Sequence, residues 1–572
     1  MTRFNATRLV GSWSSSAPVV AVLLAIVCLL LHGGALEGGF KYDDAPHLRF
    51  ASDYSPLEYF TRADVMREQS YAHITPMLSL AFDAAIALGG LDSRIHYLLH
   101  LSVLWAVAAS TWWLLSRWLS GDMAFAAAAL FLAMPPTAWV ANTLMTTHYA
   151  WGLLFSVLAL CAWARAIAAT SVFWAVTSAL LYGLACLGKE LYVPLVLVML
   201  LWPGLGWRRG ARLASPAIIV ALAYLALRYH VLGGVGGYGA ISADTQAKLA
   251  GVPDRVWFLF RDSLGDGWMG ATNAVALVAA IAIGWRGGRR LNVPFALGAA
   301  VALMLPVAPL LLIDNPYGLH RTLIFGGWTV AVLAAWSLEG ARSHVSTLAV
   351  MAAMAIALTQ ASGLAVRALE GAQRVERAEN DLVVRGAPGT DLVPNLFRGI
   401  GYLESMRTAR RNVEGVKAPA LVTSFEELAA LGTERGRNAM AWNEGCTCMQ
   451  PLGVGYDEML ARAERGAKAG SDLPLHVRVR LEDLGRTRAL EWSVHGSAGT
   501  AYLEIGQFGR YDIGPNGRVV FGLDTTVMLP AVVSFRVVVE TADGAIVRSP
   551  WLDLRMSGTN EVQWSSGSGA PR

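Results

Sequence analysis

Residues 17–36, APVVAVLLAIVCLLLHGGAL, decide the fold class, because this run is long and apolar enough to cross a membrane. The basic segment 1–8 precedes the run, an arrangement that signal peptides share. Because the run is long and further spans follow it, we interpret it as a retained first transmembrane helix. Residues 40–50, FKYDDAPHLRF, come next and place two carboxylates, a histidine and an arginine at the mouth of this span.

The composition of the whole chain predicts a membrane protein. Of the 572 residues, 55% are hydrophobic and 15% are charged, which is too apolar for a soluble protein of this size. The net charge of +4 is small and the basic residues are scattered, so a nucleic-acid partner is not expected. Three of the five cysteines fall in apolar runs, and the pairing of Cys446 and Cys448 stays open.

Apolar runs of about 17–23 residues recur along the chain and predict about eleven transmembrane helices. They lie near residues 17–36, 96–117, 121–140, 149–167, 171–188, 191–206, 214–232, 270–285, 292–313, 322–338 and 345–366. The segment 75–90 is apolar but short and contains Asp83, so we interpret it as an amphipathic helix at the outer interface.

Basic residues orient these spans. Alternating the helices gathers the basic turns on one side, which the positive-inside rule makes cytoplasmic. The residues concerned are Arg3, Arg8, Arg117, Arg165, Arg342 and the turns 207–212 and 285–290. An odd number of spans then places the first loop and the C-terminal region outside the cytoplasm.

The character of the sequence changes after the expected membrane domain, residues 1–366. Residues 367–470 are charged and predict a mixed or helical linker region. Residues 471–556 alternate apolar and polar positions between turn residues and predict a small antiparallel β domain, sandwich-like, with a hairpin turn at 542–544. The Gly- and Ser-rich stretch 557–572 is expected to be disordered.

Ionisable and aromatic residues collect at the expected outer ends of the spans. The topology was derived from the basic turns, so these residues were not used to build it. Such groups are costly at membrane depth and usually mark a site. They are Asp43, Asp44 and His47 in the first outer loop, His73, His148, Tyr149, Lys189 and Glu190, Tyr238 in GGVGGYGA, and Asp314, His320 and Arg321 in IDNPYGLHR.

Each of these groups also has a structural interpretation. Asp43 and Asp44 fit an ordinary solvated loop. In a functional site, the turn expected around Asp44-Ala45-Pro46 would instead hold the two carboxylates near the membrane surface. Lys189 and Glu190 fit a helix-end ion pair in which the lysine reaches the head groups. Singly, histidines such as His148 and His320 are more often structural than catalytic, and Arg321 could be an interfacial anchor.

Taken in order, these features resemble the GT-C fold glycosyltransferases, particularly bacterial relatives of the protein O-mannosyltransferases. The resemblance rests on the acidic pair Asp43-Asp44 and on residues 73–101, 135–155, 187–194, 228–239 and 320–328. Two positions differ from the family's pattern. Thr75-Pro76 stands where relatives often have Arg-Pro, and Arg321-Thr322-Leu323-Ile324 stands where they have Arg-Tyr-x-Tyr.

The resemblance implies a polytopic α-helical, GT-C-like enzyme of the bacterial inner membrane with its active site and C-terminal domain extracytoplasmic. Such an enzyme transfers a sugar from a polyprenyl-phosphate donor to a glycan, lipid or protein acceptor, with inversion at the anomeric carbon. It would use Asp43 as general base, with Asp44 and Glu190 as further acidic groups. Arg321, Lys189 and His320 would bind the donor phosphate.

The same resemblance implies a substrate lining and leaves a metal open. The lining would be His47, His73, His148, Tyr149 and Tyr238. Some family members use a divalent metal such as Mg²⁺ or Mn²⁺, to which Asp43, Asp44 and Glu190 could contribute oxygen ligands, although no residue spacing requires one.

Two other classes of protein stay open at this point. A transporter or flippase of an anionic lipid-linked substrate would also gather charges near one face, but with polar groups deep in the spans or with broken helices in repeated halves. A sensory protein that merely anchors the β domain would not need this many spans. An assay of sugar transfer separates the enzyme from both.

Overall fold

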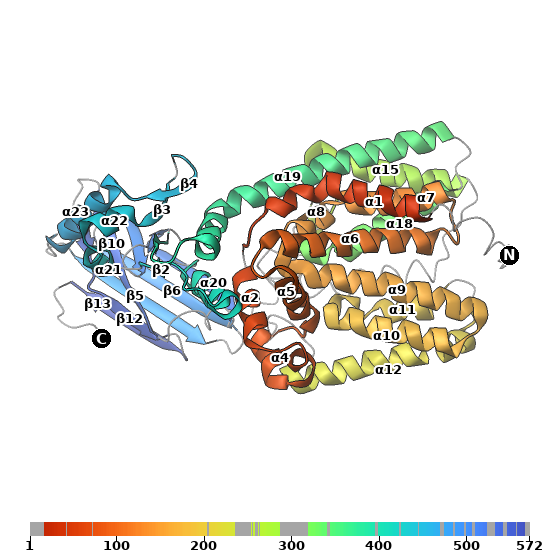
Figure 1. The fold of residues 1–572 in the computed structure, drawn as a ribbon, viewed down its shortest axis with the longest axis horizontal. Coiled ribbons are helices and arrows are strands. Elements are labelled where there is room, and N and C mark those ends of the chain that lie inside the picture. Colours follow the sequence, from red (N-terminus) through yellow and green to blue (C-terminus); the bar gives the residue numbers. More distant parts are fainter. Residues whose placement is uncertain are drawn as a thin grey trace. The chain divides into compact units, whose positions relative to one another are not determined.

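A computed structural model describes residues 17–41, 43–70, 72–202, 205–234, 253, 256–257, 261, 263–286, 319–339, 344–394, 399–422, 425–443, 445–468, 474–483, 487–496, 499–505, 509–522, 532–541, 546–555 and 558–566. The chain divides into two compact units (Figure 1). The helical unit comprises residues 1–39, 54–237 and 241–372, and the C-terminal unit comprises residues 40–53, 238–240 and 373–572. The first expected outer loop therefore belongs to the C-terminal unit.

Apolar helices with short connections build the helical unit. Asp92 caps one helix by accepting a hydrogen bond from the backbone N–H of Arg94, and Pro76 and Pro135 occupy first turns, where a missing N–H costs little. The elements are α1 (Ala17–His32), η2 (Gly33–Glu37), α3 (Glu58–Thr61), α4 (Ala63–Gln69), α5 (Pro76–Gly89), α6 (Ser93–Leu115), α7 (Gly121–Ala133), α8 (Pro135–Ala141), η3 (Leu144–Thr146), α9 (Thr147–Ala169), α10 (Val172–Gly188), η4 (Glu190–Tyr192), α11 (Leu195–Leu200), α12 (Trp207–Leu232), α15 (Gly267–Arg286), α17 (Leu319–Thr322), α18 (Ile324–Leu338) and the first part of α19 (His344–Arg385).

Among the described residues, six segments are helical, long and apolar enough to cross a membrane: Ala17–Glu37, Ser93–Leu115, Leu144–Ala169, Trp207–Leu232, Gly267–Arg286 and His344–Arg385. The pair α7 and α8, bent by 61°, makes a seventh if it forms one span. Shorter apolar helices stand at further expected positions, while the expected span 292–313 lies outside the described residues. A multi-spanning helical protein is confirmed, and the count of eleven is not. The segment 75–90 does form a helix, α5.

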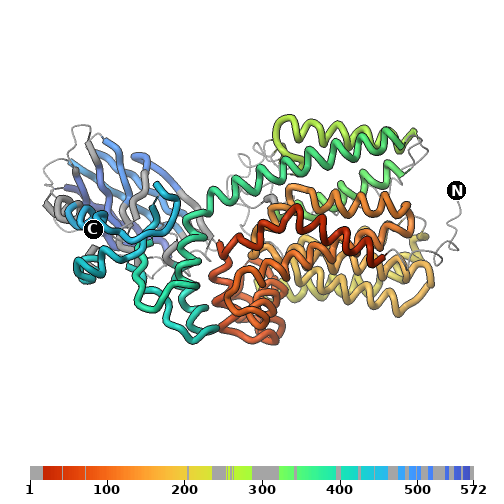
Figure 2. The backbone as a smooth tube through the Cα atoms, turned by 45° about the horizontal axis from the view of Figure 1, so that its top comes forward, coloured from red at the N-terminus to blue at the C-terminus, as the bar shows by residue number. Residues whose placement is uncertain are grey.

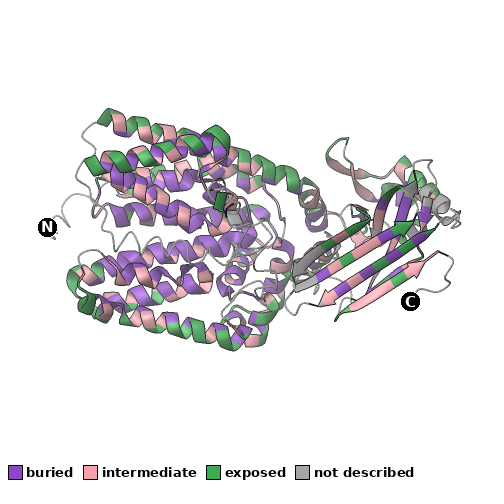
Figure 3. Cartoon of the chain, turned by 180° about the vertical axis from the view of Figure 1, so that it is seen from behind, coloured by how far each residue is buried: buried purple, intermediate pink, exposed green. Residues whose placement is uncertain are grey.

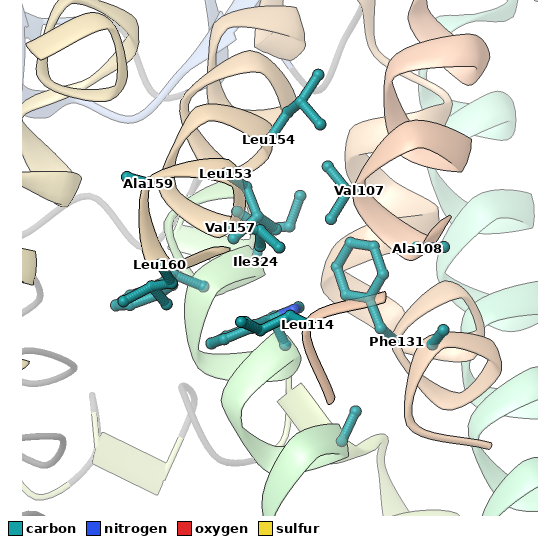
Figure 4. Close-up of a cluster of buried hydrophobic side chains, with 14 of the residues drawn as sticks. Val107, Ala108, Leu114, Phe131, Leu153, Leu154, Val157, Ala159, Leu160 and Ile324 are labelled. Carbon is teal, nitrogen blue, oxygen red and sulfur yellow. The ribbon is translucent and has the colours of Figure 1, made fainter. Parts of the chain in front are cut away.

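The helices pack around one apolar core. α12, α10, α9, α6 and α1 lie side by side in that order, and α7 and α18 pack beside them (Figures 1 and 2). Val107, Phe131, Val157 and Ile324, from four different helices, meet in this core (Figure 4). Buried and exposed positions alternate around the helices (Figure 3), and large apolar side chains such as Phe173 remain exposed, as suits helices that face lipid.

Basic residues gather at one end of the helical unit. Arg117 and Arg165 lie 4.4 and 4.7 Å from the ring centroid of Trp113. Arg209 donates a hydrogen bond to the hydroxyl of Thr170. The C-terminal ends of α6 and α9 therefore meet the N-terminal end of α12, and three of the arginines that oriented the spans lie at the same end.

The first part of the C-terminal unit is more regular than the expected linker. α19 continues past residue 366, where the membrane domain was expected to end, because the following stretch keeps good helix formers and has no proline. β1 (Asp391–Val393) runs parallel to β2 (Ala420–Leu421) and β3 (Met440–Asn443), and β3 pairs antiparallel with β4 (Cys448–Pro451). The helices of this region are α2 (Asp44–Asp53), α20 (Gly399–Glu414), α21 (Phe425–Ala430), α22 (Gly432–Asn438) and α23 (Val454–Lys468).

Two antiparallel sheets complete the unit and confirm the expected strand-rich region. One has the order β13-β5-β6-β9, and the other has the order β11-β10-β7-β8 with β12 paired to β10. Alternate residues of β5, from Leu475 to Leu481, are buried against the opposite sheet. The strands are β5 (Leu475–Asp483), β6 (Thr487–Gly496), β7 (Gly499–Ile505), β8 (Gly509–Ile513), β9 (Asn516–Gly522), β10 (Val532–Thr541), β11 (Ile546–Arg548), β12 (Leu552–Arg555) and β13 (Asn560–Ser565).

Three details of the C-terminal unit bear on the sequence predictions. β10 pairs antiparallel with β11, so the chain reverses at the expected hairpin, whose turn residues lie outside the described part. β13 lies within the stretch expected to be disordered from residue 557, which is wrong for Asn560–Ser565 because these residues pair with β5. Cys446 and Cys448 form a disulfide, a pairing that the sequence left open.

Candidate functional site

A break after α10 places Glu190 in the helical unit. α10 ends at Gly188, and a short 3-10 turn, η4, begins at Glu190. A side chain at Gly188 would lie 2.9 Å from the Cα atom of Gly152, so the glycine lets the break approach α9 closely. The phenol of Tyr192 donates a hydrogen bond of 2.6 Å to the carbonyl of Tyr149 and fixes the turn on α9.

Three basic side chains surround the Glu190 carboxylate. His73 Nδ1 lies 2.5 Å and Lys189 Nζ 3.6 Å from Oε1, and Arg228 Nη1 lies 3.8 Å from Oε2. These four residues, called here the Glu190 cluster, come from the segment before α5, the break after α10 and the end of α12. The Lys189 and Arg228 side chains are 8% and 3% exposed, and that of Glu190 is 28% exposed. The lysine is therefore buried within the unit, unlike a lysine that reaches out to head groups.

Electrostatics fix the protonation of this cluster. Burial by itself raises the pKa of Glu190, but His73, Lys189 and Arg228 together hold that pKa well below its usual range. Burial lowers the pKa of His73 to about 4, and the attraction of Glu190 only partly opposes this shift. At neutral pH Glu190 is therefore ionised, and it stands among three basic side chains. The cluster suits an anion because its basic side chains outnumber its one carboxylate.

Arg228 is a member of the cluster that the sequence analysis did not single out. Its Nη2 donates a hydrogen bond of 2.7 Å to the carbonyl of Ala72, the residue before His73. This bond ties the end of α12 to the segment that carries the histidine. An arginine inside an otherwise apolar helix was the signal that could have identified it.

Two further predicted residues adjoin the cluster. Lys189 Nζ lies 5.5 Å from the ring centroid of Tyr149. The rings of Tyr149 and His148 are 4.5 Å apart between centroids. His73, His148, Tyr149, Lys189 and Glu190, which were predicted separately along the sequence, are thus linked by contacts within one unit.

The acidic pair of the first loop lies in the C-terminal unit. The segment forms helix α2 from Asp44 onward, where a turn was expected, because Pro46 falls in the first helical turn and is tolerated there. Asp43 is half-buried and its Oδ1 accepts a hydrogen bond of 2.9 Å from the phenol of Tyr402. Asp44 is fully buried, and its Oδ2 accepts a bond of 2.9 Å from the backbone N–H of Lys41. Asp44 therefore supports the local fold, whereas Asp43 is accessible.

The remaining predicted residues are placed only in part. His47 is half-buried on α2, and Arg321 is half-buried on α17. Tyr238, Asp314 and the side chain of His320 lie outside the described residues. Among the described residues there is no group of three or more His, Cys, Asp or Glu placed to hold a metal ion. The surroundings of Glu190 do not fit a divalent metal, because two cations face its oxygens.

Comparison with known proteins finds similarity at the level of solved structures. No family model and no curated protein matches the chain. The crystal structure of ArnT from Cupriavidus metallidurans in the apo state matches with a TM-score of 0.30 and 14% sequence identity, over 75% of this chain and 92% of that chain. At this score the likeness assigns neither a fold family nor an activity.

Proposed function

We propose that the chain is an integral membrane glycosyltransferase that moves a sugar from a polyprenyl-phosphate carrier to an acceptor at the extracytoplasmic face. The Glu190 cluster is the observation that carries this proposal. Arg228 lies about 28 Å along α12 from Arg209, roughly the thickness of a bilayer's hydrocarbon core. The cluster and the basic end thus stand at opposite ends of one apolar helix, as expected for a site on the face away from the cytoplasm.

The chemistry needs cations where the phosphate departs. In the proposed reaction an acceptor oxygen bonds to the anomeric carbon while the bond from that carbon to the phosphate oxygen breaks, so the configuration inverts. The leaving phosphate takes the electron pair, and Lys189 and Arg228 stabilise the charge that develops on it. The ionised Glu190 holds these two cations close together against their repulsion. Arg321 stays a predicted further ligand of the phosphate.

The acceptor must lose a proton in the same reaction. A carboxylate is the natural recipient, and Asp43 is assigned this role because it is the accessible member of the acidic pair. Glu190 was also a candidate, but an acid whose pKa is held well below its usual range is a poor proton acceptor. We therefore assign Glu190 to positioning the cations.

A flippase of an anionic lipid-linked substrate is the second candidate function. The observation that favours it is the 61° bend between α7 and α8, since broken apolar helices are a feature of transporters. The same two cations would then bind the phosphate during passage without any bond to the sugar being broken.

Transfer from labelled donors tests the proposal. Purified full-length protein is mixed with a panel of synthetic polyprenyl-phosphate hexoses and pentoses, tritiated in the sugar, and with an extract of envelope glycans, lipids and proteins. We expect label to leave the lipid-phosphate fraction and to appear in a new glycosidic product with inverted configuration. Movement of intact labelled lipid across vesicle bilayers, with no product, would contradict the enzyme and support the flippase.

A further inference from the structure

We propose that Tyr402 is a positioning residue for the transfer reaction. Its phenol holds one oxygen of the Asp43 carboxylate and leaves the other to receive the acceptor's proton. The inference rests on the proposed function, in which Asp43 is the general base.

One hydrogen bond carries this inference. Tyr402 Oη donates to Asp43 Oδ1 over 2.9 Å, and the two residues are 359 positions apart in the chain. Tyr402 stands in the first turn of α20, and Asp43 immediately precedes α2. The backbone of Asp43 is held separately, because its carbonyl accepts a bond from the N–H of His47. The side chain is thus fixed by a residue from a distant part of the sequence.

Hydrogen bonds and buried contacts hold the helix that carries Tyr402. Arg410, on the same helix, donates hydrogen bonds of 2.8 and 2.9 Å to the carbonyls of Val383 and Gly386, at the end of α19. These are the carbonyls that a helix end leaves without helical partners, so the arginine caps α19 and anchors α20 to it. α2 packs on α20, and Leu48 of α2 and Met406 of α20 are both fully buried.

A general base works only if its oxygen lies within hydrogen-bond distance of the acceptor hydroxyl. An aspartate has a short side chain that rotates about two bonds, and only some rotamers bring its oxygen within hydrogen-bond reach of the acceptor. A misplacement of about 1 Å can cost a factor of about a hundred in rate. A phenol on a fixed helix removes most of this freedom before the acceptor arrives.

The same pair of helices supplies a matched control. Asn412 of α20 donates hydrogen bonds of 2.7 Å to Asp53 Oδ1 and 3.1 Å to Ser52 Oγ, at the far end of α2 from the acidic pair. Asn412→Ala removes a contact between α20 and the first-loop segment without touching Asp43. It separates loss of helix packing from loss of the bond to the carboxylate.

The test compares four full-length proteins in the labelled-donor assay: wild type, Tyr402→Phe, Asn412→Ala and Asp43→Asn. We expect Tyr402→Phe to lower kcat about tenfold, the effect of one lost hydrogen bond to a charged group, with the KM for the donor and the thermal unfolding midpoint unchanged. Tyr402→His, which keeps a ring N–H donor, should recover part of the rate, and Asn412→Ala should match the wild type.

The outcomes separate this inference from the proposed function. If Asp43→Asn is inactive while Tyr402→Phe stays within about twofold of wild type, the positioning role is wrong and the base assignment stands. If Asp43→Asn is active, the base assignment itself fails. Loss of the fold in Tyr402→Phe, or an equal loss of rate in Asn412→Ala, shows that Tyr402 serves packing alone and overturns the inference.

Discussion

Glu190 in the helical unit and Asp43 in the C-terminal unit are acids in opposite surroundings. Glu190 lies among three basic side chains, two of them nearly buried cations. Asp43 is held by a neutral phenol and is half-exposed. A carboxylate that cations keep ionised is suited to holding those cations, whereas a half-exposed carboxylate with a neutral donor is suited to accepting a proton. The sequence presented both as catalytic acids, and their surroundings divide the roles.

Asp43→Asn gives the largest expected effect and the most direct way to break the comparison. The change keeps the size of the side chain and removes the proton acceptor, so we expect transfer to fall by about 10²–10⁴ while the protein remains inserted and folded. Asp44→Asn is the control. Because Asp44 is buried and bonded to backbone, we expect a milder rate defect there, with lower stability. Retention of more than about a tenth of the rate in Asp43→Asn would remove the base from this position.

Glu190→Gln tests the other side of the comparison. The change leaves Lys189 and Arg228 buried without the counter-charge that each of them faces, so we expect a loss of about 2–4 kcal/mol in the free energy of unfolding in detergent. Glu37→Gln, which removes the exposed partner of Arg94, should cost less than about 1 kcal/mol. Unchanged stability in Glu190→Gln together with lost transfer would instead return Glu190 to direct catalysis.

The pH dependence of stability tests the lowered pKa of His73. Its pKa is about 4 in the folded protein and about 6.5 in the unfolded chain. Between these values the unfolded chain binds the proton and the folded protein does not, so stability is lost as the pH falls from about 6.5 to about 4. The loss is on the order of 1.4 kcal/mol per pH unit, up to about 3 kcal/mol. The unfolding midpoint of the wild type should therefore approach that of His73→Gln as the pH falls through this range. If the difference between the two midpoints stays constant with pH, folding does not lower the pKa of His73.

Gly152→Ala gives the smallest expected change and tests how the cluster is placed. A Cβ atom at this position would lie 2.2 Å from the Tyr192 ring, so η4 must shift away from α9. We expect a loss of about 1–3 kcal/mol in stability. Gly326→Ala is the control, because no atom lies within 4 Å of its added Cβ. If Gly152→Ala keeps wild-type stability and transfer, the close approach of η4 to α9 does not position the cluster.

The sequence predicted the features that depend on local pattern. Long apolar runs predicted α1, α6 and α9, and alternating apolar and polar residues predicted β5, β6 and β10. These predictions succeed because the residues of a single segment show which of its faces is buried. Lys189 and Glu190 could be singled out because charges within apolar surroundings are rare. Arg228 carried the same signal, but nothing local shows that α12 ends beside the break after α10.

Features that depend on distant contacts could not be predicted. The strands β1 and β2 have three and two residues, which is too short to show an alternation of apolar and polar residues. They pair in parallel although they lie far apart in the sequence. The bond between Tyr402 and Asp43 spans most of the chain. The first loop was expected to be part of the membrane domain, residues 1–366, yet it packs within the C-terminal unit, because α2 contacts α20.

The pairing of β13 with β5 has a consequence for how the protein is made. β5 is the first strand of the two-sheet domain and β13 is its last strand in chain order, so during synthesis β5 must wait for β13 before this edge is covered. Until then β5 offers unpaired backbone groups along Leu475–Asp483, to which a strand of another chain can add. A chain that ends before Asn560 would keep every other strand of the two sheets and still expose this edge, and we expect it to aggregate where the chain that includes β13 stays dispersed.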